Sequence, residues 1–483
     1  MANVVIPPSL AWVSGINVIL FAAPTFWATR WWLGWRDAFL LWGALGVLAL
    51  VIETSAIITG FPYGHFGYSG LLGFRLFGLT PWTVFLAWTP LVLAAYAIAR
   101  RLFEAKPLAV SYQLVASILR IVLTAVLLVV FDLVLDPGAV KIGFWRYEGG
   151  GVFYGVPVSN FVGWLFSGAI AGVVLETFTW IKRPLLPAPA QMISSTFFIV
   201  SFWTFIAFFS GMYWPLAIGI VVIALLAAFY SKYHYAFDDM IVYCDESGVP
   251  TGTSRKLAAH DGDTKRHLAF SIFLFNDKGE LLLQQRALTK KTWPGVWSNS
   301  CCGHVMLHES TESAARRRLK YELGMRVDKL HLILPDFRYR AEKDGVVENE
   351  ICPVFVGFAS ALPRPNPAEV NDVKWVDWEQ FVVEVADPAN GYSPWAREEV
   401  ELLVKGGSLD RSRIRSWDRY RCEASPLCRF HQTAFLEGAP DDLAVFLAVR
   451  ALAVDLSIEE IAFVLFALYW ARSHKPVCLC QSF

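Results

Sequence analysis

Long apolar runs dominate the first half of the chain, whereas shorter and more polar patterns follow about residue 232. A helix that crosses a bilayer needs about 20 mostly apolar residues, because its backbone finds no hydrogen-bond partners in lipid. Seven runs approach that length: Leu10–Phe26, Phe39–Thr59, Pro81–Ala99, Tyr112–Leu135, Phe161–Ile181, Ser194–Ser210 and Trp214–Tyr230. The pattern therefore predicts a polytopic all-α membrane domain of about seven helices over residues 1–235.

The positive charges between these runs predict an orientation. If the spans alternate, one side holds Arg30, Arg36, Arg100, Arg101, Lys106, Lys182, Arg183 and Lys232, and the other holds Arg75, Lys141 and Arg146. Loops rich in Lys and Arg stay on the cytoplasmic side. We therefore expect an integral protein of the cell inner membrane, with the segment after Tyr230 in the cytoplasm.

The pattern of that segment predicts a multi-domain chain, with an α+β domain over residues 236–405. Ala269–Phe275 and Glu280–Gln285 alternate like strands, and Asn276–Gly279 suits the turn of a hairpin. Thr311–Tyr321 has helical composition and ends near Gly324, and further strands are expected over Ile351–Phe358 and Val373–Val376. A helical tail follows over residues 406–483, and its role is not readable from its sequence.

Composition excludes some functions. Lys+Arg and Asp+Glu both number 42, so no basic surplus indicates a nucleic-acid partner. The eight cysteines follow no spacing of a secreted disulfide scaffold, and the pattern is that of a cytosolic enzyme. The sequence does not indicate an oligomeric state.

Four carboxyl groups fall within or near the predicted spans: Glu53, Asp132, Asp136 and Glu176. Ionisable groups in a bilayer are costly, so each is a functional candidate, although each could instead pair with another group to hold the bundle together. Two segments rich in glycine and aromatic residues, 61–68 and 136–160, are expected as loops. They suit a lid over an elongated apolar ligand, and they equally suit an aromatic belt at the membrane interface.

Three motifs carry a resemblance in this half: ETSAIITGFPYGHFGY, LDPGAVKIGFWRY and YGVPVSNFVGW. They are similar to the integral-membrane carotenoid biosynthesis family that includes carotenoid 1',2'-hydratases. The resemblance implies a carotenoid partner and the acid-catalysed addition of water to the terminal double bond of an acyclic end group. One of the four carboxyl groups would then donate a proton to the alkene.

In the second half, a patterned set consists of Gly303, Glu309 and the segment from Arg317 to Met325. This set resembles the Nudix box, a loop-helix-loop that presents carboxylates to a divalent ion on a diphosphate, but Arg318 and Tyr321 stand where the box has Glu. Loss of these carboxylates predicts that diphosphate binding remains while hydrolysis is in doubt. A Nudix diphosphate hydrolase, joined to a non-catalytic membrane anchor or carotenoid-binding domain, is the alternative reading.

The departures and their neighbours resemble type 1 isopentenyl-diphosphate isomerase. The motifs are GVPTGT, AAH, HLAF, RALTKKTWPGVWSNSCCGH, YELG, PDFRYRA, ENEICPVF and YSPW, in the order of that family. The resemblance implies conversion of isopentenyl to dimethylallyl diphosphate, with Cys302 and Glu350 on opposite faces of the allylic carbons. Trp395 would stabilise a tertiary carbocation through its π face, and Tyr339 would hydrogen-bond near Glu350.

The same resemblance implies two metal sites. One divalent ion (Mn²⁺, Zn²⁺ or Mg²⁺) would be held by His260, His267, His304, Glu348 and Glu350. Glu322 would hold Mg²⁺, which the substrate diphosphate completes, and positive charge for the phosphates would come from Lys256, Arg286, Lys290 and Arg318. Together the two resemblances predict an isomerase fused to a membrane domain of carotenoid biosynthesis.

Overall fold

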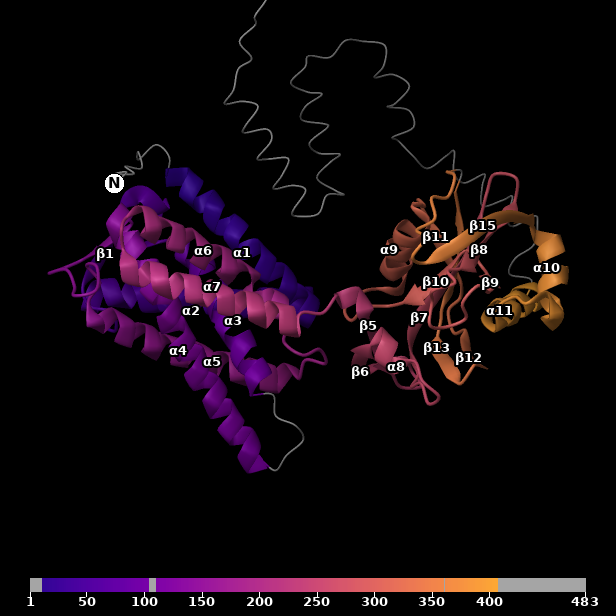
Figure 1. Ribbon diagram of the computed structural model, residues 1–483, viewed down its shortest axis with the longest axis horizontal. Coiled ribbons are helices and arrows are strands. Elements are labelled where there is room, and N and C mark those ends of the chain that lie inside the picture. The colour runs from indigo at the N-terminus through magenta and orange to yellow at the C-terminus, as the bar shows by residue number, and fades with distance from the viewer. Residues whose placement is uncertain (1–10, 104–109, 360, 407–483) are drawn as a thin grey trace, which may run out of the picture. The chain divides into compact units, whose positions relative to one another are not determined.

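The computed structural model describes residues 11–103, 110–359 and 361–406 (Figure 1). We describe two parts separately: the helical region, residues 11–233, and the sheet region, residues 240–405. All but the first residue of the predicted tail, 406–483, lies outside the described residues, so its helical character stays a prediction.

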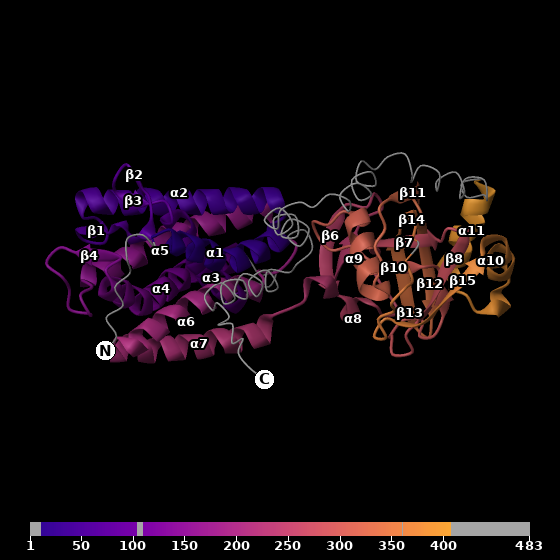
Figure 2. The same ribbon diagram turned by 90° about the horizontal axis from the view of Figure 1, so that it is seen from above.

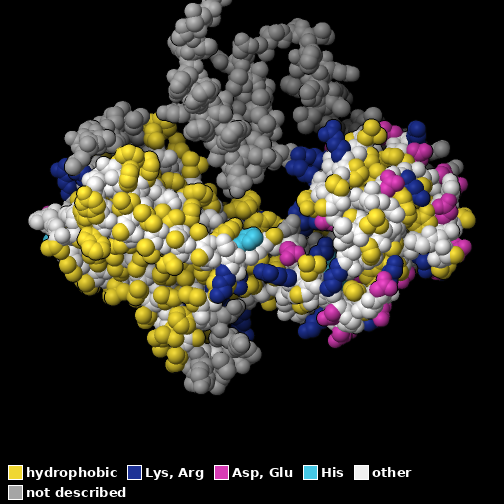
Figure 3. Space-filling view, viewed as in Figure 1, with side chains coloured by type: hydrophobic (Ala, Val, Ile, Leu, Met, Phe, Trp, Pro, Cys, Tyr) yellow, Lys and Arg dark blue, Asp and Glu magenta, His cyan; other side chains and the backbone are white. Residues whose placement is uncertain are grey.

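The helical region contains seven helices among its described residues. They are α1 (Ala11–Leu33), α2 (Trp35–Thr59), α3 (Val84–Leu102), α4 (Val110–Ile142), α5 (Val158–Lys182), α6 (Ser194–Phe209) and α7 (Tyr213–Tyr233). With the short helical turn Ala190–Ile193 counted as part of α6, each is long and apolar enough to cross a membrane. Hydrophobic side chains cover most of the face of the helical region that Figure 3 shows. The predicted set of about seven apolar helices is confirmed.

Small residues bring these helices close together. A Cβ atom on Gly168 of α5 would lie 2.9 Å from the Cα of Ala125 in α4, and one on Gly172 would lie 3.1 Å from the Cα of Ile121. Close approach of backbones at small residues is a usual way for membrane helices to gain contacts, since lipid offers no hydrophobic driving force between them. Substituting either glycine would push α4 and α5 apart.

Two sequence expectations in this region need correction. Residues 136–142 are helical, because α4 continues through Pro137 to Ile142 instead of ending in a loop at Asp136. Gly138 lies so close to Trp203 of α6 that a Cβ would approach its ring to 2.6 Å, and this packing supports the turn that Pro137 weakens. The two aromatic segments also pair with each other, since β1 (Phe66–Tyr68) lies antiparallel to β4 (Trp145–Tyr147).

The sheet region is α+β, as predicted. Its strands are β5 (Met240–Cys244), β6 (Pro250–Arg255), β7 (His267–Phe275), β8 (Glu280–Arg286), β9 (Trp297–Ser298), β10 (Cys301–His304), β11 (Leu330–Leu334), β12 (Arg338–Lys343), β13 (Val346–Ile351), β14 (Val354–Phe358) and β15 (Val370–Asp377). Its helices are α8 (Lys256–Ala259), α9 (Thr311–Leu323), α10 (Trp378–Ala386) and α11 (Pro394–Lys405). Helix α9 lies on one side of the strands, and α10 and α11 lie on the other (Figures 1 and 2).

Strand β7 organises the sheet. It pairs antiparallel with β10 and parallel with both β13 and β14. The predicted strands around residues 269–275, 280–285 and 373–376 are present, as is the helix that ends at Gly324. The strand predicted over 351–358 is divided, because Pro353 has no N–H to continue a ladder and offers only its carbonyl, to the amide of Ser271.

Candidate active site

Cys302 and Glu350 lie on two strands that both pair with β7. Cys302 of β10 is opposite Ser271, and Glu350 of β13 is opposite His267. His267 and Ser271 are four residues apart on β7, so they share one face of the strand, and residues directly opposite them point to that same face. The register therefore brings the thiol and the carboxylate to one side of the sheet.

The Cys302 thiol and the Glu350 carboxyl differ in whether they carry a proton. Burial, followed by the negative charge of Glu399, raises the pKa of the Cys302 thiol to about 12, so the thiol keeps its proton. Burial acts to raise the pKa of Glu350 too, but the adjoining imidazoles of His267 and His304 outweigh it and hold this pKa well below its usual range. The hydroxyl of Tyr339 donates to Glu350 Oε2 at 2.8 Å. The site thus pairs a proton-bearing sulfur with an ionised carboxylate.

Aromatic rings enclose this pair. The indole N–H of Trp395 donates to Ser298 Oγ at 2.9 Å, and this bond fixes the ring. Its ring centroid lies 5.6 Å from that of Tyr339 and 5.5 Å from that of Trp293. All three residues are buried. Such a wall offers π faces to a carbocation and keeps water out.

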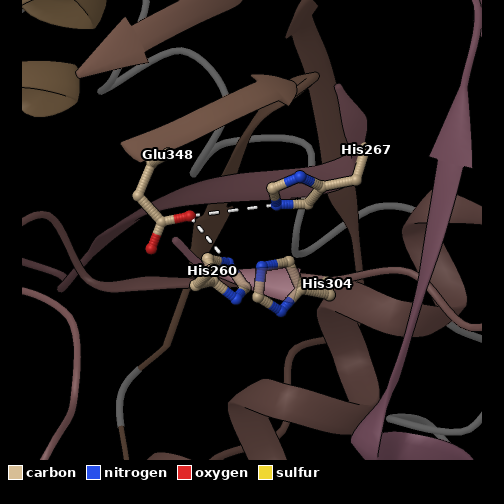
Figure 4. Close-up of side chains that lie close together, drawn as sticks. All are labelled: His260, His267, His304 and Glu348. Carbon is tan, nitrogen blue, oxygen red and sulfur yellow. Dashed lines mark ion pairs between the residues drawn. The ribbon is translucent and has the colours of Figure 1, made fainter. Parts of the chain in front are cut away.

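Three histidines and a glutamate converge beside the pair (Figure 4). His260 follows α8, His267 begins β7, His304 ends β10 and Glu348 lies in β13. Each offers one ligand atom, and these atoms all lie within 4.8 Å of one another. Glu350 Oε1 is 3.3 Å from the Nε2 atoms of both His267 and His304, so it adjoins the same group.

The hydrogen bonds of these histidines prepare them to hold a cation. The Nδ1 atoms of His260 and His267 bond to the backbone carbonyls of Lys256 and Lys265, at 2.6 and 2.9 Å. A carbonyl can only accept, so Nδ1 carries the proton and Nε2 presents its lone pair to the group. The Nε2 atoms of both residues and Oε2 of Glu348 are buried without a hydrogen-bond partner among the described residues. Such buried, inward-facing acceptors fit a divalent metal.

The predicted phosphate-binding residues divide into two sets. Lys290 and Arg318 both form ion pairs with Glu369, at 2.6 and 3.1 Å, and burial together with these two cations lowers the pKa of Lys256 to about 8. Arg286 instead donates to the carbonyl of Thr292, and its guanidinium lies 5.7 Å from the ring centroid of Trp395. The first three residues thus form a basic cluster, whereas Arg286 belongs to the aromatic wall.

Glu322 lies with this basic cluster and apart from the histidines. Its carboxylate pairs with Arg318 and accepts a hydrogen bond from Gln284 at 3.3 Å. The structure therefore places the two predicted metal positions in different surroundings. The neighbouring Cys301 is fully buried in the core.

Of the four membrane carboxyl groups, three come together in the helical region. Asn160 Nδ2 donates to Oδ2 of both Asp132 and Asp136, at 2.7 and 2.6 Å. Asp136 and Glu53 both line one apolar cavity. Glu176 is elsewhere, in a two-bond ion pair with Arg120 at 2.7 Å, which fits the structural alternative for that residue.

Comparison with known proteins agrees with this division. Residues 13–226 match the family described as carotenoid biosynthesis protein, and residues 265–397 match the NUDIX domain. An isopentenyl-diphosphate Delta-isomerase of Saccharopolyspora erythraea is 48% identical over 171 residues, which are 35% of this chain and 88% of that protein. The chain belongs to the isopentenyl-diphosphate Delta-isomerase family. Both resemblances predicted from the sequence are confirmed.

Other members of this isomerase family are similarly close. A protein of the same name from Escherichia coli K12 is 49% identical over 156 residues, covering 32% of this chain and 86% of its own length. A crystal structure of a Deinococcus radiodurans protein is 19% identical with a TM-score of 0.28, and covers 34% of this chain and 97% of that protein.

This member of the isomerase family also holds site residues that the sequence reading missed. Asn299 Oδ1 accepts from the Cys302 thiol at 3.1 Å, and Asn299 stands inside the motif that carried the resemblance. Glu369 pairs with the basic cluster, but it lies in a loop that contains none of the motifs. Glu399 of α11 is fully buried, and burial raises its pKa well above the usual range. Glu399 lies four residues, about one helical turn, after Trp395, and this spacing was the signal in the sequence that could have identified it.

Proposed function

We propose that the sheet region isomerises isopentenyl diphosphate to dimethylallyl diphosphate. The observation that carries the proposal is the placement of Cys302 and Glu350 on one face, on strands that both pair with β7. Moving the double bond requires one proton to be added at the terminal carbon and another to be removed from the methylene two carbons away. A proton-bearing thiol and an ionised carboxylate supply one group that gives and one that takes.

The surrounding residues support this chemistry. Tyr339 donates to Glu350 and so orients one of its oxygens toward a fixed position. Trp395 would face the tertiary carbocation that forms between the two proton transfers, where cation–π attraction in a desolvated site is worth about 2 kcal/mol. The buried aromatic wall excludes water, which would otherwise capture this cation as an alcohol.

The histidine group fits a divalent metal on its donor chemistry. His260, His267, His304 and Glu348 would hold it, with Glu350 beside them. Such a set of imidazole and carboxylate ligands suits Mn²⁺, Zn²⁺ or Mg²⁺. When bound, the ion supplies positive charge that fixes the orientation of the Glu350 carboxylate.

The basic cluster is the proposed site of the diphosphate. Lys256, Lys290 and Arg318 supply the charge, and the planar guanidinium of Arg318 suits two-point contact with phosphate oxygens. Glu322 would hold Mg²⁺ there, since one carboxylate together with phosphate oxygens is a common set of ligands for this ion. Glu369 forms ion pairs with two of these cations. When the substrate binds, its phosphates would replace the Glu369 carboxylate as their partner.

The competing function is hydrolysis of a diphosphate by a Nudix enzyme. Arg318 argues against it, because this cation occupies a position where the hydrolase motif has a metal-binding carboxylate. Incubating the full chain with isopentenyl diphosphate separates the two functions. Isomerisation gives dimethylallyl diphosphate and no phosphate, whereas hydrolysis releases phosphate or diphosphate.

For the helical region we propose hydration of the terminal double bond of an acyclic carotenoid in the cell inner membrane. The match to a carotenoid biosynthesis family and the carboxyl groups on an apolar cavity support this function. The distribution of Lys and Arg supports a cytoplasmic position for the isomerase site. Expression of the full chain in cells that make lycopene tests hydration, because each event adds the mass of one water.

A further inference from the structure

The apolar cavity of the helical region has one polar wall. Aromatic and aliphatic side chains from α1, α3, α6 and the β1–β4 ribbon form most of its lining. Asp136, Asn160 and Tyr147 contribute adjoining polar groups, and Glu53 contributes another carboxyl. An elongated hydrocarbon could therefore enter with one end beside these groups.

Hydrogen bonds fix the position of this wall. Tyr147 donates to Asp136 Oδ2 at 2.6 Å, the same oxygen that accepts from Asn160. The same Asn160 nitrogen also donates to Asp132 Oδ2 at 2.7 Å, so the two buried carboxyl groups share one donor atom and lie close together. Two carboxylates this close in an apolar site, with no cation between them, repel each other, so at least one of the two keeps its proton.

The partners of the acid pair are all neutral. Within the described residues, the ion pairs of the helical region are Arg120 with Glu176 and Lys182 with Asp37, and neither involves the pair. Asp132 Oδ1 and the indole nitrogen of Trp88 are among the buried polar atoms that lack a hydrogen-bond partner in the described helical region. Trp88 lines the same cavity as Asp136 and is 5% exposed, so its N–H is an unused donor in the cavity lining. An unused donor in a cavity that an acid also lines suits an incoming water or a product hydroxyl.

Resting on the hydration proposed above, we infer that the Asp132–Asp136 pair is its acid catalyst and that Trp88 holds the oxygen of the water. Asp136, which reaches the cavity, gives its proton to the less substituted carbon of a terminal trisubstituted alkene. The π electrons form the new C–H bond and leave a tertiary carbocation. Water forms the C–O bond and returns one proton to the Asp136 carboxylate, so the net change is the addition of one water.

This assignment selects among the four candidate carboxyl groups. Glu176 is excluded as the acid because its two oxygens are engaged by Arg120. Glu53 lines the cavity and accepts a hydrogen bond from Tyr68 at 3.0 Å, but among the described residues it shares no hydrogen-bond donor with a second carboxyl group. Asp132 acts through Asp136 and is a positioning residue.

The test uses the full chain expressed in lycopene-producing cells, with pigments analysed by mass. Asp136→Asn should lower hydrated product by at least about 10²-fold, the usual contribution of a general acid. Trp88→Phe should lower it by about tenfold, the value of one hydrogen bond. Asp37→Asn, which removes a carboxyl from a surface ion pair, is the matched control and should leave the yield unchanged.

Binding is measured separately, from the visible absorption of lycopene on the purified variants, and should be retained in Asp136→Asn. Hydrated product in both the wild type and Asp136→Asn would overturn the assignment of the acid. A wild type that binds lycopene but yields no hydrated product would instead reject the hydration itself. If Asp136→Asn lowers the amount of protein, Tyr147→Phe decides: a reduced yield at normal protein level supports the pair, and an unchanged yield opposes it.

Discussion

The carboxyl groups that define the two proposed sites have different surroundings. In the sheet region they face cations or potential cation ligands: Glu350 adjoins two histidines, and Glu369 pairs with Lys290 and Arg318. In the helical region Asp132 and Asp136 accept hydrogen bonds only from neutral groups. The first environment suits a substrate with a charged head, and the second suits an uncharged hydrocarbon.

Both proposed reactions protonate an alkene to a tertiary carbocation, so the acid alone does not distinguish them. The difference lies in what the cation meets next. In the sheet region the aromatic wall excludes water, so the cation loses a proton to a base. In the cavity, the polar groups and the unused N–H of Trp88 allow a water to add to the cation. The partners of a buried carboxyl therefore indicate substrate and outcome better than the carboxyl itself does.

The most severe way to break the comparison is to remove the thiol. Cys302→Ala deletes one of the two proton-transfer groups, and we expect isomerase activity to fall by about 10³-fold. Conversion of labelled isopentenyl diphosphate measures the change. Cys244→Ala, on strand β5 and outside the site, should keep wild-type activity, and the yield of hydrated carotenoid should be the same in both variants. Near-normal isomerase activity in Cys302→Ala would remove the basis of the proposed mechanism.

Removal of metal should give the next largest difference between the activities of the two regions. Chelation should lower isomerase activity by at least about 10²-fold, the largest loss usual for mutating residues that only support the metal ligands, and re-addition of Mn²⁺ or Mg²⁺ should restore it. Hydration should be unaffected, because its proposed groups are two carboxyls and neutral donors. Metal analysis before and after chelation provides the occupancy. Equal sensitivity of the two activities would show that the contrast between the regions is wrong.

The ion pair of Arg120 and Glu176 tests whether a carboxyl group that pairs with a cation in the helical region serves stability and not chemistry. Glu176→Gln leaves a buried guanidinium without its counter-charge, which should destabilise the helical region by about 3 kcal/mol. A lower thermal midpoint in detergent measures this loss. Protein that remains folded should still hydrate lycopene. Loss of hydration without loss of stability would instead make Glu176 part of the chemistry.

The smallest expected effect is a change of KM with pH. Lys256 has its pKa lowered to about 8, first by burial and then by Lys290 and Arg318. Its ammonium is charged below this pH and neutral above it, so the KM for isopentenyl diphosphate should rise as pH increases through 8. We expect about a tenfold rise, since a hydrogen bond to a charged group is worth about 1.5–3 kcal/mol. Lys256→Arg stays charged and should show no rise, and a parallel rise in that variant would assign the titration to another group.

Local patterns predicted much of this molecule, and the failures have physical causes. Apolar runs marked the helices because lipid imposes one requirement on every residue of a span. The end of α4 was missed because Pro137 and Gly138 normally stop a helix, and only contact with Trp203, 65 residues later, keeps it going. Sequence alone could not divide the four membrane carboxyls into a pair, a single group and an ion pair.

The motifs pointed to the candidate site, and His260, His267, His304 and Glu348 lie close together in the structure, although their role as metal ligands stays a proposal. No motif pointed to Glu369 or Glu399, because their roles come from neighbours distant in the sequence. Glu369 is separated from Lys290 by a hairpin, a helix and several strands, so nothing local marks it as the partner of the basic cluster.

The register of β7 has a consequence for how this protein can change. His267 and Ser271 bring Glu350 and Cys302 from two different strands, so inserting one residue between them would turn one of the two toward the opposite face. Acid, base and metal ligands would separate in a single event. A change of one residue in this stretch of β7 would therefore disrupt the whole site at once.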